Sequence, residues 1–113
     1  MSASRGGAAR QAAPVFAALG DTTRLALVRR LSVDGPLSIT RLSEGSGMTR
    51  QAITRHLHSL ERAGLVCDTR QGREHVFSLD LKRLEVAREY LGHVSAQWDA
   101  AAARLKAFVE AEK

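Results

Sequence analysis

The sequence predicts a mainly α-helical fold with one small β-hairpin. Between Ser38 and Leu79 the pattern runs through a short helix, a glycine-bearing turn, a longer helix and two short strands joined by a basic connection. Apolar residues at helical spacing precede this block, and one long helical pattern follows it. Four helices, two strands and a final helix, in that order, are the elements of a winged helix-turn-helix.

Length and composition limit the class of protein. The chain has 113 residues, which suffices for one domain with a modest core. Its formal net charge of +5 favours a polyanionic partner, although charge alone does not identify one. The single cysteine excludes an intrachain disulfide, and the sequence shows neither a secretory signal nor an apolar run long enough for a membrane span. We therefore expect a cytoplasmic protein with no membrane partner.

The domain boundaries follow from these patterns. Residues 1–12 are mostly small and include two adjacent glycines, so we expect them to form a disordered arm. Residues 13–80 contain the elements of the winged helix-turn-helix domain. Residues 81–113 are expected to form a C-terminal dimerisation helix.

Capping residues mark the predicted helix ends. Pro14 suits the first turn of the first helix. Asp21, Ser38 and Thr49 each precede a helical pattern and are suitable N-caps for the second, third and fourth helices. Gly64 stands where a left-handed residue would end the fourth helix.

The fourth helix has an apolar face and a polar face. Ile53, Leu57 and Leu60 fall at helical spacing and define the buried side. The opposite side and its flank carry Gln51, Arg55, His58 and Arg62, with Arg50 and Thr54. Side chains of these types donate hydrogen bonds, and Arg and Gln suit bidentate contacts with base edges. The pattern therefore indicates a helix that enters the major groove of DNA.

The two strands are predicted over residues 65–67 and 76–79. Gly72 is the natural turn residue between them, which places Arg70 and Arg73 near the tip of the hairpin. We expect both arginines to contact phosphates or the minor groove. Cys67, in the first strand, is expected to be a small, partly buried packing residue.

The C-terminal helix carries a long apolar seam. Leu84, Leu91, Trp98 and Leu105 recur every seven residues, and a second series from Ala87 to Phe108 recurs between them. A domain this small cannot cover so long a seam, so we expect a homodimer to which the first helix also contributes. The predicted dimerisation residues are Phe16, Leu84, Leu91, Val94, Trp98, Leu105 and Phe108.

Three segments carry a family resemblance. ALGDTTRLALVRRL is similar to an A-L-x-D-x-T-R-L-x-I-L-x-L-L opening, and GMTRQAITRHLHSLERAGLV to a G-L-S-Q-S-x-V-S-x-H-L-x-x-L-x-x-A-G-L-V recognition block. QGREHVFSL is similar to a G-R-x-x-x-Y-x-L wing. Together these segments, over residues 15–79, resemble the ArsR-type winged-helix repressors of bacteria and archaea.

The resemblance implies a homodimer that binds a palindromic operator in double-stranded DNA. Most members of the family repress their own operon. Arg24 and His56 also match family positions, and we expect both to be structural. Arg24 is expected to form an ion pair or a cap, and His56 to make a local hydrogen bond. Arg50, Gln51, Thr54 and Arg55 stand where the family's recognition helix touches DNA. With the neighbouring positions, the predicted DNA-binding residues are Ser38, Thr40, Thr49, Arg50, Gln51, Thr54, Arg55, His58, Arg70 and Arg73.

The chain departs from the family's metal-sensing members. Ser38-Ile39-Thr40 occupies the place of their Cys-x-Cys pair, and hydroxyl groups are poor ligands for soft metals. Other members use a His or Glu three residues before a second His on the final helix, whereas this helix offers only His93. We therefore expect no metal site and no cofactor.

The sequence is compatible with several alternatives. The sequence contains no phosphate-binding glycine loop, nucleophile elbow or ligand cluster, so we expect no enzyme. A repressor could sense a metal at unfamiliar ligands, or an unknown organic inducer near Trp98. From a different class, a winged helix can serve protein interaction, although such a helix would more often present an apolar or acidic face.

Overall fold

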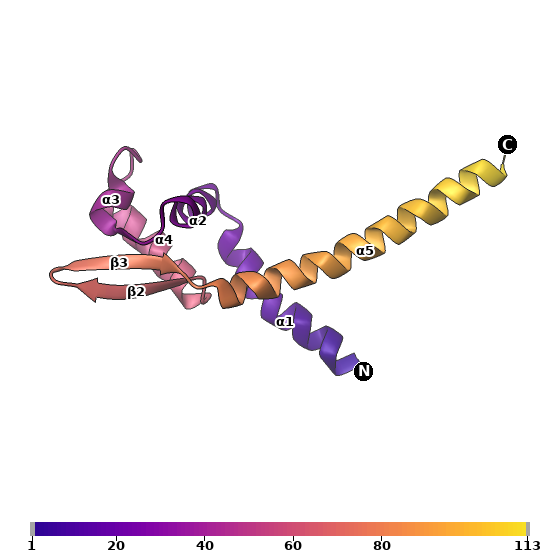
Figure 1. The fold of residues 1–113 in the computed structure, drawn as a ribbon, viewed down its shortest axis with the longest axis horizontal. Coiled ribbons are helices and arrows are strands. Elements are labelled where there is room, and N and C mark those ends of the chain that lie inside the picture. The colour runs from indigo at the N-terminus through magenta and orange to yellow at the C-terminus, as the bar shows by residue number, and fades with distance from the viewer. Residues whose placement is uncertain (1, 113) are drawn as a thin grey trace.

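The computed structural model describes residues 2–112 and confirms the predicted fold class. The chain forms five helices and three short strands within that range, in the order expected for a winged helix-turn-helix (Figure 1). The elements are α1 (Ser2–Leu19), α2 (Thr22–Asp34), β1 (Leu37–Ser38), α3 (Ile39–Ser43), α4 (Arg50–Arg62), β2 (Val66–Gln71), β3 (Glu74–Leu79) and α5 (Leu81–Ala111).

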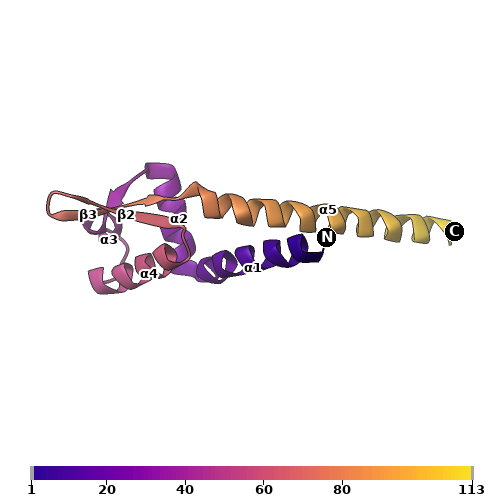
Figure 2. The same ribbon diagram turned by 90° about the horizontal axis from the view of Figure 1, so that it is seen from below.

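Helix α1 corrects the expectation of a disordered arm over residues 1–12. The helix begins at Ser2, and Met1 lies outside the described residues. Ala12 and Val15 are each only 1% exposed, because α1 packs along the first half of α5 (Figure 2). Alanine has the highest helix propensity, and its small side chain permits close packing against α5. The segment therefore belongs to the folded structure.

The sequence predicted Pro14 in the first turn of the first helix. The structure places it inside α1 instead. Proline lacks the N–H group that would bond the carbonyl group of Arg10. Both residues are exposed, so water can satisfy that carbonyl group. The helix tolerates the proline on this surface.

The other predicted helix ends are confirmed. Asp21, Ser38 and Thr49 each accept a hydrogen bond from the backbone N–H three residues further on, at 3.0–3.1 Å. These bonds satisfy N–H groups that have no partner within the helix. Gly64 follows α4 with φ of 78°, the left-handed conformation that glycine adopts most readily. Local chemistry thus defines where α2, α3 and α4 begin and where α4 ends.

The core lies between α4, α2 and the sheet. Its largest fully buried side chains are Phe77, Leu42, Ile53, Leu57, Leu60, Leu65 and Val15. Ile53, Leu57 and Leu60 are the residues that the helical spacing assigned to the buried side of α4. Their burial fixes the rotation of α4 about its own axis, and therefore which of its residues face solvent.

The hairpin is longer than predicted. Pairing between β2 and β3 continues to Gln71 and Glu74, which leaves only Gly72 and Arg73 as the turn. The polar residues of this region gave no apolar alternation, so the sequence did not reveal the extension. The structure also contains β1, which the sequence had not predicted, paired antiparallel with β3 through Leu37 opposite Phe77. The sheet order is β1-β3-β2.

Helix α5 extends well beyond the rest of the molecule. It is 31 residues long and begins at Leu81, directly after its N-cap Asp80. Its first part packs on α1, where the rings of Phe16 and Tyr90 lie 6.1 Å apart, whereas its second part projects alone (Figures 1 and 2). None of the described helices is both long and apolar enough to cross a membrane.

Candidate nucleic-acid interface

The exposed side of α4 is a continuous polar stripe. Gln51, Arg55, His58 and Arg62 are all exposed, on the side of the helix opposite its buried leucines. We call these four residues the recognition stripe. Thr54 lies beside the stripe, but its hydroxyl group donates to the backbone oxygen of Arg50 at 2.7 Å. Its donor is therefore used within the helix.

Several predicted DNA-binding residues meet on one flank of α4. A small hollow of about 70 Å³ is lined by Thr40 from α3, Arg50 from α4 and Arg73 from the wing turn, together with Glu74 and His75 of β3. Residues far apart in the sequence are thus brought to one place beside the recognition stripe. We call this side of α4 the wing flank.

Two of the predicted residues serve mainly as caps. Ser38 is only 8% exposed, and its Oγ accepts a hydrogen bond from the backbone N–H of Arg41. Ser38 thus begins α3, and it also lines the hollow of the wing flank beside Thr40. Thr49 is exposed but accepts in the same way from Ala52, which begins α4.

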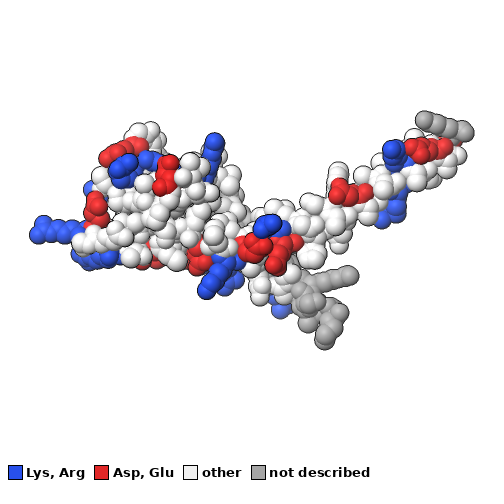
Figure 3. All heavy atoms as spheres, viewed as in Figure 1, with Lys and Arg blue, Asp and Glu red and all other residues white. Residues whose placement is uncertain are grey.

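The wing presents both predicted arginines to solvent. Arg70 and Arg73 are exposed near the turn, and Nε of Arg70 donates to the backbone oxygen of Gly72 at 3.3 Å. Basic side chains protrude at this end of the molecule in Figure 3. Further from the tip, His75 Nδ1 lies 3.1 Å from Asp68 Oδ1 across the two strands. The basic groups at the tip are thus those best placed for phosphates.

Arg24 and His56 have the structural roles that the sequence predicted. Nε of Arg24 donates to the carbonyl oxygen of Ala18 at the end of α1. The same guanidinium group lies 3.4 Å from Nδ1 of His56 on α4, which is 3.8 Å from Asp21 Oδ2. The hydrogen bond from the backbone N–H of Arg24 holds the pKa of Asp21 below its ordinary value, with smaller contributions from the neighbouring Arg24 and His56 charges. This junction connects α1, α2 and α4.

The C-terminal half of α5 exposes large apolar side chains. Trp98 is 73% exposed, and Leu105 and Phe108 are each 64% exposed. Leu91 and Val94 are also exposed, whereas Phe16 and Leu84 are partly covered by packing within the chain. An apolar stripe of this length is unusual on a monomer and is typical of an interaction surface.

Cys67 differs from its expected partly buried position. It is exposed on β2, because its neighbour Val66 occupies the inward-facing position of the strand. Its Sγ lies 3.8 Å from Oδ2 of Asp80. Among the described residues, no three His, Cys, Asp or Glu side chains are grouped so that they could hold a metal ion.

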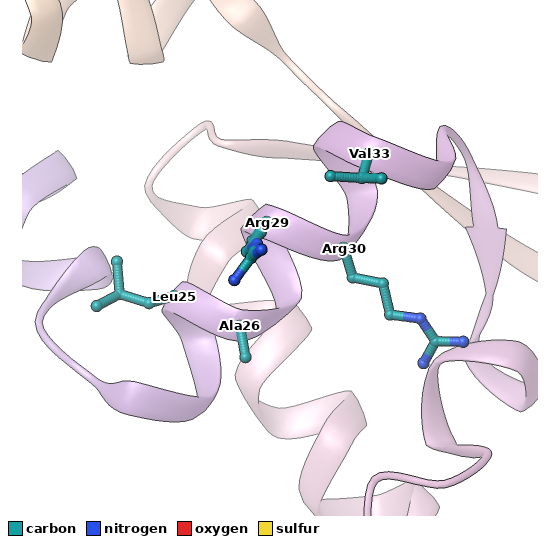
Figure 4. Close-up of a pocket in the computed structure, with 5 residues that line it drawn as sticks. All are labelled: Leu25, Ala26, Arg29, Arg30 and Val33. Atoms are coloured by element: carbon teal, nitrogen blue, oxygen red, sulfur yellow. The ribbon is translucent and has the colours of Figure 1, made fainter.

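Another hollow lies away from α4. It has a volume of about 480 Å³ and runs along the outer side of α2, where Leu25, Ala26, Arg29, Arg30 and Val33 line it (Figure 4). All five residues come from one helix, so no second element closes around a ligand. We therefore place the functional site at α4 and the wing.

The chain is similar to known helix-turn-helix proteins. A family model described as a helix-turn-helix domain matches residues 19–66. The chain is 41% identical over 71 residues to the HTH-type transcriptional regulator Rv2034 of Mycobacterium tuberculosis, covering 63% of this chain and 65% of that protein. It is 40% identical over 72 residues to the regulator NmtR of the same organism, covering 64% of this chain and 59% of that protein. The chain thus matches less than two thirds of the length of either relative.

Solved structures extend the similarity to the whole fold. An ArsR-like transcriptional regulator from Rhodococcus sp. RHA1 superposes with a TM-score of 0.73 at 33% identity, covering 88% of this chain and 93% of that one. The fold, the family model and these relatives define a transcriptional regulator with a helix-turn-helix DNA-binding domain. The chain belongs to the ArsR family of these regulators, which are not enzymes.

Proposed function

We propose that this protein is a homodimeric repressor that binds a palindromic operator and does not respond to metals. One observation carries the proposal: the recognition stripe on α4 is exposed, rich in hydrogen-bond donors and fixed in orientation by the core beneath it. Such a helix can read base edges in the major groove while the neighbouring wing contacts the backbone.

The dimer is supported by the apolar stripe of α5. The proposed dimerisation residues Leu91, Val94, Trp98, Leu105 and Phe108 are all exposed on α5, and the last three lie on its C-terminal half, which projects beyond α1. Between residues 91 and 103, Asp99 is the one residue of the Asp, Glu, Lys and Arg types. Packing this stripe against a second copy would remove it from water and would pair two DNA-binding domains.

The first prediction concerns base reading by the recognition stripe. Footprinting on DNA upstream of the protein's own gene would supply the operator. Gln51→Ala and Arg55→Ala should each weaken binding to this operator by about 1–3 kcal/mol, because each removes a side chain suited to bidentate base contacts. Binding to a random duplex should change much less. Gel-shift titrations at one fixed salt concentration measure both affinities.

Arg29→Ala on the outer side of α2 is the matched control for Arg55→Ala, since it makes the same change of side chain away from α4 and away from the apolar stripe of α5. It should leave operator affinity unchanged. Equal losses on operator and random DNA for Gln51→Ala and Arg55→Ala would show phosphate contacts only. Such a result would contradict the proposed reading of sequence by α4.

The second prediction is that zinc, cadmium, nickel and arsenite do not alter operator binding. A regulatory metal site normally combines several Cys, His or carboxylate ligands. Ser38 and Thr40 stand where metal-sensing members have cysteines, and His93 is exposed on α5. Operator affinity should be the same with each metal as with a chelator. Release at micromolar metal, abolished by His93→Ala or Cys67→Ser, would establish the alternative of a metal-sensing repressor.

A further inference from the structure

A second hollow adjoins α4 on the side away from the wing. It has a volume of about 400 Å³ and is lined by Arg24 of α2 together with Arg55, His56, His58, Ser59 and Arg62 of α4. Arg55, His58 and Arg62 belong to the recognition stripe, so the hollow is continuous with it. We call this side of α4 the α2 flank.

The α2 flank is strongly basic. Its lining contains three arginines and no acid. The nearest carboxylate in the junction described above is Asp21, which is engaged by the backbone N–H of Arg24 and lies near His56. The flank therefore holds an excess of fixed positive charge beside the stripe.

The arginines of this flank are not engaged by acids among the described residues. Arg30, Arg41 and Arg88 each form an ion pair with an acid three or four residues away. Within the described part of the chain, no carboxylate forms such a pair with Arg24, Arg55 or Arg62. Arg62 instead donates from Nη2 to the hydroxyl oxygen of Ser59 at 3.3 Å, which directs its guanidinium group along the helix surface. Its remaining donors are open to a partner.

The position of the flank identifies the partner. A helix in the major groove lies between the phosphate backbones of two strands. The wing flank, with Arg50 and Arg73, lies on one side of α4, and the α2 flank lies on the other. Guanidinium groups bind phosphate oxygens through paired hydrogen bonds. Both sides of α4 therefore carry the side chains that a phosphate backbone requires.

We propose that Arg62 binds a backbone phosphate of the DNA strand opposite the strand that the wing contacts. Arg24 lines the same hollow and adds positive charge there. This inference rests on the proposed function, because it places α4 in the groove. It assigns Arg62 to the backbone and leaves base reading to Gln51 and Arg55, nearer the start of α4. The recognition helix is then held from both sides.

The test compares Arg62→Ala with Arg29→Ala, which removes another exposed arginine, from the outer side of α2 (Figure 4). Arg62→Ala should weaken operator and random DNA by the same factor. It should also lower the slope of log affinity against log salt by about 0.9, the value for one phosphate contact in duplex DNA. Arg29→Ala should leave the slope unchanged. Arg24 is not the test residue, because it also supports the end of α1.

A phosphate scan locates the contact. Single phosphates of the operator are replaced by neutral methylphosphonates, and the affinity of each duplex is measured. At one position beside the half-site, on the strand away from the wing, the replacement should weaken the wild type and have no effect on Arg62→Ala. If Arg62→Ala instead loses affinity for the operator alone, or keeps the wild-type slope, the inference is wrong while the proposed function stands. If the wild type binds operator and random DNA equally, the proposed function fails.

A competition experiment with inorganic phosphate completes the test, because a free phosphate has the same chemistry as the backbone group. At constant ionic strength, exchanging chloride for inorganic phosphate should affect wild-type and Arg62→Ala binding equally. Selective displacement of the wild type would assign the α2 flank to a small anion and overturn its assignment to DNA.

Discussion

Leu105→Glu is expected to convert the protein to a monomer and to lower operator affinity by roughly 10³-fold or more, toward the level of non-specific binding. The substitution places a carboxylate in the proposed apolar interface, where an unpaired charge is costly. A monomer can occupy only one half-site, because the second recognition helix must lie about 34–36 Å away on the same side of the duplex. Analytical ultracentrifugation and operator titration measure the two effects.

The structure makes this variant easy to interpret. Leu105 is 64% exposed and lies on the part of α5 that projects beyond the domain, so its replacement should leave the fold of a single chain intact. Ala103→Glu is the control, since it adds the same charge to the opposite side of the helix and should leave both association and operator affinity unchanged. A Leu105→Glu protein that sediments as a monomer and still binds the operator normally would contradict the dimer model.

Phe77→Ala is expected to lower the free energy of unfolding by about 3–5 kcal/mol. Phe77 is completely buried on the central strand β3, opposite Leu37 of β1 and Asp68 of β2. Truncation removes the ring and leaves a cavity in the core that supports α4. The loss is a large part of the roughly 5–15 kcal/mol that stabilises a typical domain. Denaturant titration at one protein concentration measures it.

Val76→Ala is the control for the core substitution. Val76 is the preceding residue of β3, where it is only partly buried, and its truncation should cost about 1 kcal/mol or less. Similar losses for Phe77→Ala and Val76→Ala would show that the sheet does not depend on the inward-facing ring. The midpoint of unfolding should fall far more for Phe77→Ala.

The sequence predicted those features that depend on local chemistry. The N-caps Asp21, Ser38 and Thr49 were identified correctly, because a cap bonds a backbone group only three residues away. The buried side of α4 was identified because strongly apolar residues recur at helical spacing. The recognition stripe follows from that side, since it is the opposite surface of the same helix.

Features that depend on distant segments could not be predicted in the same way. Ala12 is buried only because α5 lies against it, and a run of small residues gives no periodic signal. The extended pairing of Gln71 with Glu74 depends on two polar strands that show no apolar alternation. The α2 flank requires Arg24 and Arg62 to be brought together by the packing of α2 on α4. Sequence spacing does not contain that proximity.

The junction at Arg24 gives the proposed dimer a fixed length scale. Helix α1 packs along α5, and near its end the carbonyl oxygen of Ala18 accepts a hydrogen bond from Arg24. The same guanidinium group lies against His56 on α4. Helix α4 is thus connected to α5 through α1, without a flexible linker. One added base pair between half-sites would move the second half-site by about 3.4 Å and turn it by roughly a tenth of a revolution. The protein would then require one fixed spacing between half-sites. Two half-sites with the correct bases at another spacing would not form an operator for it.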